Sequence, residues 1–195
     1  MEASDVVNSE IYLQEKVLFE SGKKYLIKAN SGQGKSSLLN FIYGLNTAFE
    51  GEISYGKTSN YTTRSQQKIS YVFQDFKLFE QLTVWENILL KNELTNHKTA
   101  TEIAQLLEKV GLLAKKDTLL AKLSLGQRQR VAIIRALCQP FEWLLLDEPF
   151  SHLDETNITI LTQLITTELA QKQAGMLLTS LGSDYLFDYD KIIHL

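Results

Sequence analysis

One eight-residue segment, residues 30–37, constrains the fold of this chain more than any other feature. It reads Asn-Ser-Gly-Gln-Gly-Lys-Ser-Ser, follows the strand-like run 25–29 and precedes the apolar stretch 38–42. In such a loop the backbone N–H groups point inward at an anion, and the following helix adds its positive N-terminal end. The segment therefore predicts a phosphate-binding loop for a nucleoside triphosphate, in which Lys35 reaches the β- and γ-phosphates and Ser36 ligates Mg²⁺.

The start of this loop departs from the usual pattern, because Ala29 stands where the first glycine normally lies. An alanine at positive φ is strained by roughly 1 kcal/mol. We therefore expect that the loop either avoids that conformation or accepts a small cost. Taken alone, the segment also fits an ordinary Gly/Ser turn between a strand and a helix.

Two adjacent acids follow a second apolar run. Residues 143–147 read Trp-Leu-Leu-Leu-Asp, and Glu148 comes next. The three leucines predict a buried parallel strand that delivers the acids at its carboxyl edge, and they argue against a surface Asp-Glu pair. Asp147 is then placed to hold Mg²⁺ through water, and Glu148 to polarise a water that attacks the γ-phosphate.

A second potential anion site comes shortly before that strand. Residues 123–127 read Leu-Ser-Leu-Gly-Gln, and a helix is expected from 126 to 137. A serine and a glycine at a helix start offer free N–H groups to an anion. The same residues also fit an ordinary helix cap, and by themselves they favour that simpler interpretation.

Composition limits the class of protein. The chain has 195 residues, is 44% hydrophobic and 22% charged, and carries a net charge of −3. These values fit one globular domain with a sizeable core, and the absence of a basic block argues against nucleic acid as a partner. We expect no secretion signal and no membrane-spanning segment, so any role at a membrane goes through a partner. The single cysteine, Cys138, lies in an apolar helical stretch and is expected to be a buried structural thiol.

Hydrophobic periodicity predicts alternating strands and helices, which indicate an α/β sheet with parallel strands. The expected helices are 36–43, 84–91, 101–110, 126–137 and 156–171. The expected strands are 25–29, 52–55, 69–73, 143–147, 176–179 and 191–195, preceded by short strands within 5–18.

Taken together, these motifs resemble the ATP-binding cassette family, the ATPase subunits of ABC transporters. Residues 29–37 resemble the Walker A loop, and residues 123–127 resemble the family signature. Asp147 and Glu148 resemble Walker B and the catalytic base, and Gln74 resembles the Q-loop glutamine, which touches Mg²⁺. The signature serine and the Walker B aspartate are separated by 23 residues (147 − 124), a spacing that is specific to this family.

The resemblance covers nearly the whole chain and implies its fold. The expected architecture is an α/β P-loop NTPase core with a mostly parallel sheet and N-terminal antiparallel β strands. A helical subdomain is inserted at about 75–125 within a single nucleotide-binding domain of residues 1–195. Residues 151–154, Ser-His-Leu-Asp, resemble the D-loop, where His152 is expected to contact a second cassette.

The resemblance also implies how ATP is held, between two cassettes that face each other head to tail. The residues expected to bind ATP from one chain are Asn30, Ser31, Gly32, Gln33, Gly34, Lys35, Ser36 and Ser37. Those expected from the facing chain are Ser124, Gly126 and Gln127. The residues expected to act on Mg²⁺ are Ser36, Gln74 and Asp147, and the catalytic set is Glu148, Lys35, Gln74 and Ser180.

An ATPase subunit of this family implies a membrane partner. We expect a transmembrane permease subunit, which would hold this chain on the cytoplasmic face of the inner or plasma membrane. The second cassette is either another copy or a different chain, and the sequence leaves this open. The transported substrate and the direction of transport belong to the permease.

Three departures from the family pattern bear on activity. Ser180 occupies the position of the switch histidine, and serine can donate one hydrogen bond but carries no charge. Leu125 replaces the first glycine of the signature pair, which is a mild change. Adenine is usually stacked on an upstream aromatic residue, for which Tyr12 is the best but poorly placed candidate, so weaker or less selective nucleotide binding is predicted.

These departures keep a second function open. In that alternative the chain is a nucleotide-binding switch subunit with weak or no turnover, and ATP binding alone clamps two cassettes together. A third interpretation, a soluble ABC ATPase of DNA repair or translation, is disfavoured because the chain has no long coiled coil, second cassette or basic face.

Overall fold

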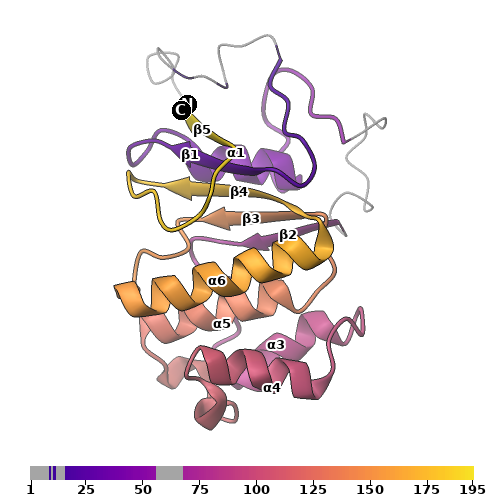
Figure 1. Ribbon diagram of the computed structural model, residues 1–195, viewed down its shortest axis with the longest axis vertical. Helices are drawn as coiled ribbons and strands as arrows, with labels where there is room; N and C mark the ends of the chain where they lie inside the picture. The colour runs from indigo at the N-terminus through magenta and orange to yellow at the C-terminus, as the bar shows by residue number, and fades with distance from the viewer. Residues whose placement is uncertain (1–8, 10, 12–15, 56–67) are drawn as a thin grey trace.

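The computed structural model describes residues 9, 11, 16–55 and 68–195. Within them, five strands form one parallel sheet in the order β2-β3-β4-β1-β5 (Figure 1). The strands are β1 (Lys24–Lys28), β2 (Ile69–Val72), β3 (Trp143–Asp147), β4 (Gly175–Ser180) and β5 (Lys191–His194). Every ladder is parallel, so the carboxyl ends of all five strands lie along the same edge.

The sheet is covered on both faces, as expected for parallel strands. Alternate residues of β1 separate the two sides: Tyr25 and Ile27 belong to one apolar cluster and Leu26 to the other. Helix α1 (Lys35–Tyr43) covers the first side through residues such as Leu39. Helices α5 (Leu125–Leu137) and α6 (Glu155–Lys172) lie side by side over the second side (Figure 1).

Helices α3 (Val84–Asn92) and α4 (Ala100–Lys109) lie beyond α5 and α6 (Figure 1). Each begins with a capping box, Thr83 with Glu86 and Thr99 with Glu102. Two short 3₁₀ turns, η2 (Leu113–Lys115) and η3 (Leu120–Lys122), lead from α4 into α5. The apolar side chains of both helices join the larger core cluster, so this region shares its core with the sheet.

The segment between α3 and α4 is attached to α6 by a buried ion pair. Lys98 Nζ lies 2.7 Å from Glu168 Oε1, and Lys172 pairs with the same carboxylate. Burial by itself would raise the pKa of Glu168, but hydrogen bonds from Lys172 and Lys98 outweigh it and lower the pKa. The charged carboxylate therefore helps to fix the orientation of α3 and α4 on the rest of the molecule.

Most predicted elements are confirmed to within a residue or two, and the α/β class with a parallel sheet is confirmed. The predicted strand 52–55 is wrong over residues 52–54, which are in no strand. None of the four residues is fully buried, and only Tyr55 packs against the apolar cluster on the α1 side of the sheet, so the segment contributes a single side chain to the core. The strands predicted within 5–18 fall mostly outside the described residues, as does Tyr12, and residues 16–18 are in no strand. The N-terminal antiparallel strands therefore stay a prediction.

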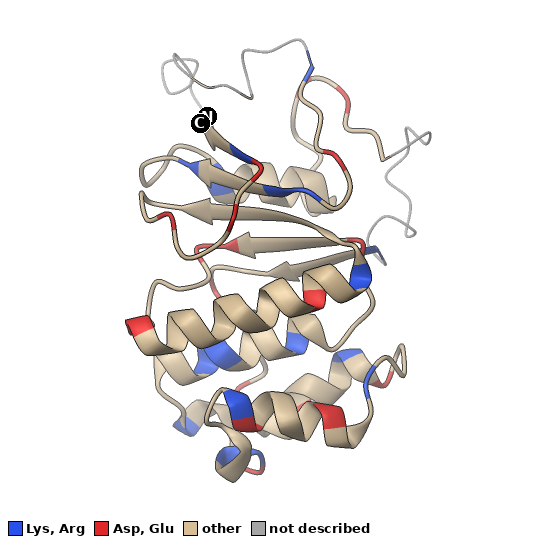
Figure 2. Ribbon diagram, in the orientation of Figure 1, with Lys and Arg blue, Asp and Glu red and all other residues tan. Residues whose placement is uncertain are grey.

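Charges are distributed over the molecule without a dominant sign. Figure 2 shows lysine and arginine dispersed among aspartate and glutamate over the helices, strands and loops. Among the residues that the structure describes, no helix combines the length and the apolar character needed to cross a membrane.

Candidate functional site

The loop between β1 and α1 has the conformation expected of an anion cradle. Gly32 and Gly34 have φ values of 82° and 88°, in the left-handed region that only glycine adopts without cost. Gly34 is the N-cap of α1, and no side chain caps the helix. No acidic residue lies in the first turn of α1 either. Its first N–H groups and its positive dipole end are therefore available to a negatively charged ligand.

Ala29 causes no strain at the start of the loop. It does not belong to the described non-glycine residues with positive φ, and its N–H donates to the Ser180 carbonyl at 3.3 Å. The loop thus avoids the conformation that would require glycine, which is the first of the two expected outcomes. A second contact holds the loop from within, because the Asn30 N–H donates to Gln33 Oε1 at 2.7 Å.

Lys35 lies at the centre of a set of contacts that we call the Lys35 cradle: Lys35, the carbonyls of Ala29 and Asn30, and the Glu148 carboxylate. Lys35 Nζ donates to both carbonyls at 2.9 Å and lies 3.2 Å from Glu148 Oε1. The two charged side chains are 4% and 12% exposed. An ammonium group has three donors, so a phosphate that binds Lys35 exchanges with at least one of these partners.

The two acids lie where the strand pattern predicts. Asp147 ends β3 and is buried, and Glu148 follows it with a φ of 47°. The Thr179 hydroxyl donates to Asp147 Oδ1 at 2.8 Å and accepts from the Glu148 N–H at 3.1 Å. Tyr71 OH lies 3.5 Å from Asp147 Oδ2. Burial, and then the Asp147 charge, raise the pKa of the Tyr71 phenol well above its usual value, so it stays protonated as a donor.

The other residues expected around a metal also converge on this edge of the sheet. Ser36, on the first turn of α1, has its Oγ 3.4 Å from Gln74 Oε1, just after β2. Hydroxyl, amide and carboxylate oxygens are the ligands that Mg²⁺ prefers. The described part of the chain holds no cluster of three His, Cys, Asp or Glu residues suited to a metal. The donor set therefore fits a hard cation that is completed by water and phosphate.

Ser180 uses its hydroxyl inside its own turn. The side chain is buried, and its Oγ donates to the Ser183 carbonyl at 2.7 Å and accepts from the Gly182 N–H at 3.1 Å. A hydroxyl has one hydrogen, so its only donor is committed here. The predicted role of Ser180 as a phosphate donor requires this bond to break, and it stays a prediction.

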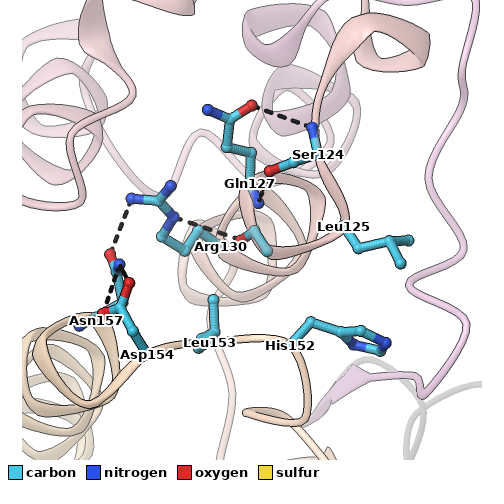
Figure 3. Close-up of a pocket in the computed structure, with 9 residues that line it drawn as sticks. Ser124, Leu125, Gln127, Arg130, His152, Leu153, Asp154 and Asn157 are labelled. Carbon is cyan, nitrogen blue, oxygen red and sulfur yellow. Dashed lines mark hydrogen bonds between the residues drawn. The ribbon is translucent and has the colours of Figure 1, made fainter.

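A separate cavity of about 440 Å³ lies at the start of α5, and we call it the Ser124 groove (Figure 3). Its lining residues are Ser124, Leu125, Gly126, Gln127, Arg130, His152, Leu153, Asp154 and Asn157. Ser124 caps α5, and its side chain and that of Gln127 form a capping box. The helix-cap interpretation of these residues is therefore correct for this chain by itself, and the exposed Leu125 side chain borders the groove.

Helix α5 connects the groove to the acids. The Gln129 side chain is buried, and its Nε2 lies 3.3 Å from both the Glu148 carbonyl and Ser151 Oγ, while its Oε1 accepts from the His152 N–H at 3.1 Å. A Cβ added at Gly126 would lie 2.7 Å from the His152 carbonyl oxygen. Gly126 is thus required for close packing of α5 on residues 151–154.

Sequence reasoning missed Thr179, Gln129 and Arg130. Arg130 donates to Asn157 Oδ1 at 2.9 Å, a contact between two residues that line the groove (Figure 3), and to the Val110 carbonyl at 2.6 Å. The sequence signal that could have identified these residues is their position. Thr179 lies at the carboxyl end of a strand, and Gln129 and Arg130 lie on the helix that begins at the signature. Their partners depend on contacts between distant segments.

Comparisons with known proteins agree with this geometry. A family model described as "ABC transporter" matches residues 15–151. The thiamine import ATP-binding protein ThiQ of Histophilus somni is 40% identical over 180 residues, which cover 89% of this chain and 84% of the relative. The cytochrome c biogenesis ATP-binding export protein CcmA of Haemophilus influenzae is 36% identical over 165 residues, covering 83% and 77%.

A solved structure extends the likeness to three dimensions. It is the ATP-binding cassette MJ0796, a dimer in a post-hydrolysis state bound to ADP and Pi. It superimposes with a TM-score of 0.81 at 27% identity, over 92% of this chain and 83% of that one. A cassette from Pyrococcus furiosus, a putative ABC transporter ATP-binding protein, gives 0.76 over 90% of this chain and 86% of that one at 24% identity, which supports the fold alone.

Proposed function

Since this chain belongs to the ABC transporter family of ATP-binding cassettes, we propose that it binds and hydrolyses ATP to power a separate transmembrane subunit. The observation that carries this proposal is the Lys35 cradle, in which a buried lysine and a largely buried acid meet beside an uncapped helix N-terminus. Such a site offers positive charge, N–H donors and a base within one small volume.

The phosphate chain is proposed to bind along the loop. The contributing residues are Asn30, Ser31, Gly32, Gln33, Gly34, Lys35, Ser36 and Ser37. Backbone N–H groups hold the phosphate oxygens, and Lys35 offsets the negative charge that grows between the β- and γ-phosphates. Ser36, Gln74 and Asp147 are proposed to hold Mg²⁺, which would neutralise negative charge on the phosphates when bound.

Glu148 is proposed as the base that orients the attacking water. It already lies 3.2 Å from the Lys35 ammonium, at the end of β3 and against the loop. A γ-phosphate at Lys35 would take over part of that pairing and leave the carboxylate free to accept a hydrogen bond from water. In this proposal the Lys35 ammonium binds the phosphate, and the Glu148 carboxylate then orients the water.

The Ser124 groove is proposed to bind the γ-phosphate of a facing cassette. Ser124, Gly126 and Gln127 lie at the N-terminal end of α5, whose dipole favours an anion. The similarity to a dimeric cassette bound to ADP and Pi supports this arrangement. The second chain is proposed to be either another copy of this chain or a related cassette.

The transmembrane partner is proposed to be a permease subunit that holds the chain on the cytoplasmic face of the inner or plasma membrane. The named relatives serve one import and one export system, so they leave the direction and the transported substrate open. We place the whole chain in a single nucleotide-binding domain, with α3 and α4 in a helical subdomain at about 75–125.

One observation favours a second function. Ser180, at the position of the switch histidine, has its hydroxyl donor committed to Ser183. A cassette without a free donor there would bind ATP and clamp its partner with weak or no turnover. This alternative shares the binding site and differs only in the rate of hydrolysis.

A turnover assay with wild type and Glu148→Gln separates the two functions. We expect wild type to release phosphate and the variant to lose at least about 100-fold in rate, because the amide cannot accept a proton from water. ATP binding serves as the control and should persist in the variant. Equal, background-level phosphate release by both proteins would refute the enzyme and support the switch.

A further inference from the structure

A buried threonine connects the two acids of the site. Thr179 lies on β4, and the parallel ladder pairs it with Asp147 on β3. Its side chain is fully buried in this structure. The hydroxyl lies beside the end of β3, within hydrogen-bond distance of Asp147 Oδ1 and the Glu148 N–H.

The hydrogen-bond geometry assigns the single hydroxyl proton of Thr179. Oγ1 lies 2.8 Å from Asp147 Oδ1, whereas the Leu146 carbonyl is 3.5 Å away. The hydroxyl therefore donates its hydrogen bond to the Asp147 carboxylate. An oxygen lone pair of the same hydroxyl accepts from the Glu148 N–H at 3.1 Å. One group thus orients the Asp147 side chain and the Glu148 backbone.

The Glu148 backbone needs such support. Its φ is 47°, in the left-handed region that is strained for a non-glycine residue. The Gln129 side chain holds the other end of the same residue through the Glu148 carbonyl. Thr179 and Gln129 therefore hydrogen-bond the N–H and the carbonyl of one strained residue. These two bonds help to hold the Glu148 backbone in the conformation that directs its carboxylate toward Lys35.

We propose that Thr179 is a positioning residue that fixes the Asp147 carboxylate for the metal and the Glu148 backbone for the base. The inference rests on the proposed function, because it assumes the metal role of Asp147 and the base role of Glu148. Removal of a residue that hydrogen-bonds a metal-binding carboxylate typically lowers metal affinity or activity by about 10- to 100-fold.

The test compares Thr179→Val, which keeps the shape and loses the hydroxyl, with Thr179→Ser, which keeps the hydroxyl. We expect Thr179→Val to weaken Mn²⁺ affinity in the ATP complex, measured by electron paramagnetic resonance, by about 10-fold or more. The rate constant kcat should fall with it, whereas ATP binding in EDTA should stay within about two-fold of wild type. Thr179→Ser should recover most of both losses.

Two results would overturn the inference. One is a Thr179→Val protein with wild-type Mn²⁺ affinity, and the other is a Thr179→Ser protein as impaired as Thr179→Val, since packing of the methyl group would then explain the effect. Thermal unfolding of each variant identifies a folding defect. If wild type binds ATP and Mn²⁺ without turnover, the hydrolytic function fails while the Mn²⁺ comparison still decides the role of Thr179.

Discussion

The Lys35 cradle and the Ser124 groove differ in completeness: a single chain supplies all the contacts of the cradle, whereas the groove stays open. In the cradle, the ammonium of Lys35 meets two carbonyls and a carboxylate of its own chain, and both charged side chains are nearly buried. In the groove, the polar groups of Ser124 and Gln127 satisfy each other in a capping box, and a cavity of about 440 Å³ stays open beside them.

This difference indicates that the two regions have different roles in nucleotide binding. In the cradle, one chain supplies both the Lys35 ammonium and the uncapped start of α1, which is the combination that we propose for binding phosphate. The groove has the dipole of a helix end and an adjoining cavity, and needs a second surface to form a closed site. We therefore expect the cradle to bind nucleotide in a single chain, and the groove to act only when another cassette brings its nucleotide.

Gly126→Ala should sharpen the comparison at the groove. The added Cβ would lie 2.7 Å from the His152 carbonyl, so α5 and residues 151–154 must separate. Overpacking of this kind costs about 1–3 kcal/mol in the free energy of unfolding. Urea unfolding measures the loss, and nucleotide binding at the cradle should change little.

The matched control is Leu125→Ala, one residue earlier on the same helix, where the side chain is exposed. A surface truncation of this kind should stay within about 0.5 kcal/mol of wild type. Equal stability of the Gly126→Ala and Leu125→Ala proteins would show that the close contact with His152 is not a constraint on the fold.

The smallest of the expected effects is the slow labelling of a thiol at the C-terminal end of the same helix. Cys138 caps the C-terminal end of α5 and is fully buried, and burial raises the pKa of its thiol to about 12. The thiolate is the reactive form, so a thiol reagent at pH 8 should label the native protein very slowly and the urea-unfolded protein fast. Rapid labelling of the native protein would show that Cys138 is accessible to solvent and contradict its burial at this end of α5.

The sequence predicted the features that depend on local patterns. The glycine-bearing loop before α1, the helix cap at Ser124 and the strand that delivers Asp147 all follow from neighbouring residues. Lys35 and Glu148 were both expected to act at the γ-phosphate, and the structure places their charged groups 3.2 Å apart.

Features that depend on contacts between distant segments were not predictable in the same way. The pairing of Thr179 with Asp147 requires the strand order, which no local pattern encodes. The commitment of the Ser180 hydroxyl depends on a turn with Gly182 whose geometry the composition leaves open. The strand predicted at 52–55 has the right alternation, but only Tyr55 packs against the core, and residues 52–54 are in no strand.

Calorimetric titration of ATP with Mg²⁺ into three proteins tests the central claim most directly. Wild type and Ser124→Ala should each bind one ATP per chain, while Lys35→Gln should lose at least about 100-fold in affinity, since about 3 kcal/mol of charge-assisted contact disappears. Absence of uptake by wild type, or equal loss in Ser124→Ala and Lys35→Gln, would contradict the claim that the Lys35 cradle binds the nucleotide by itself.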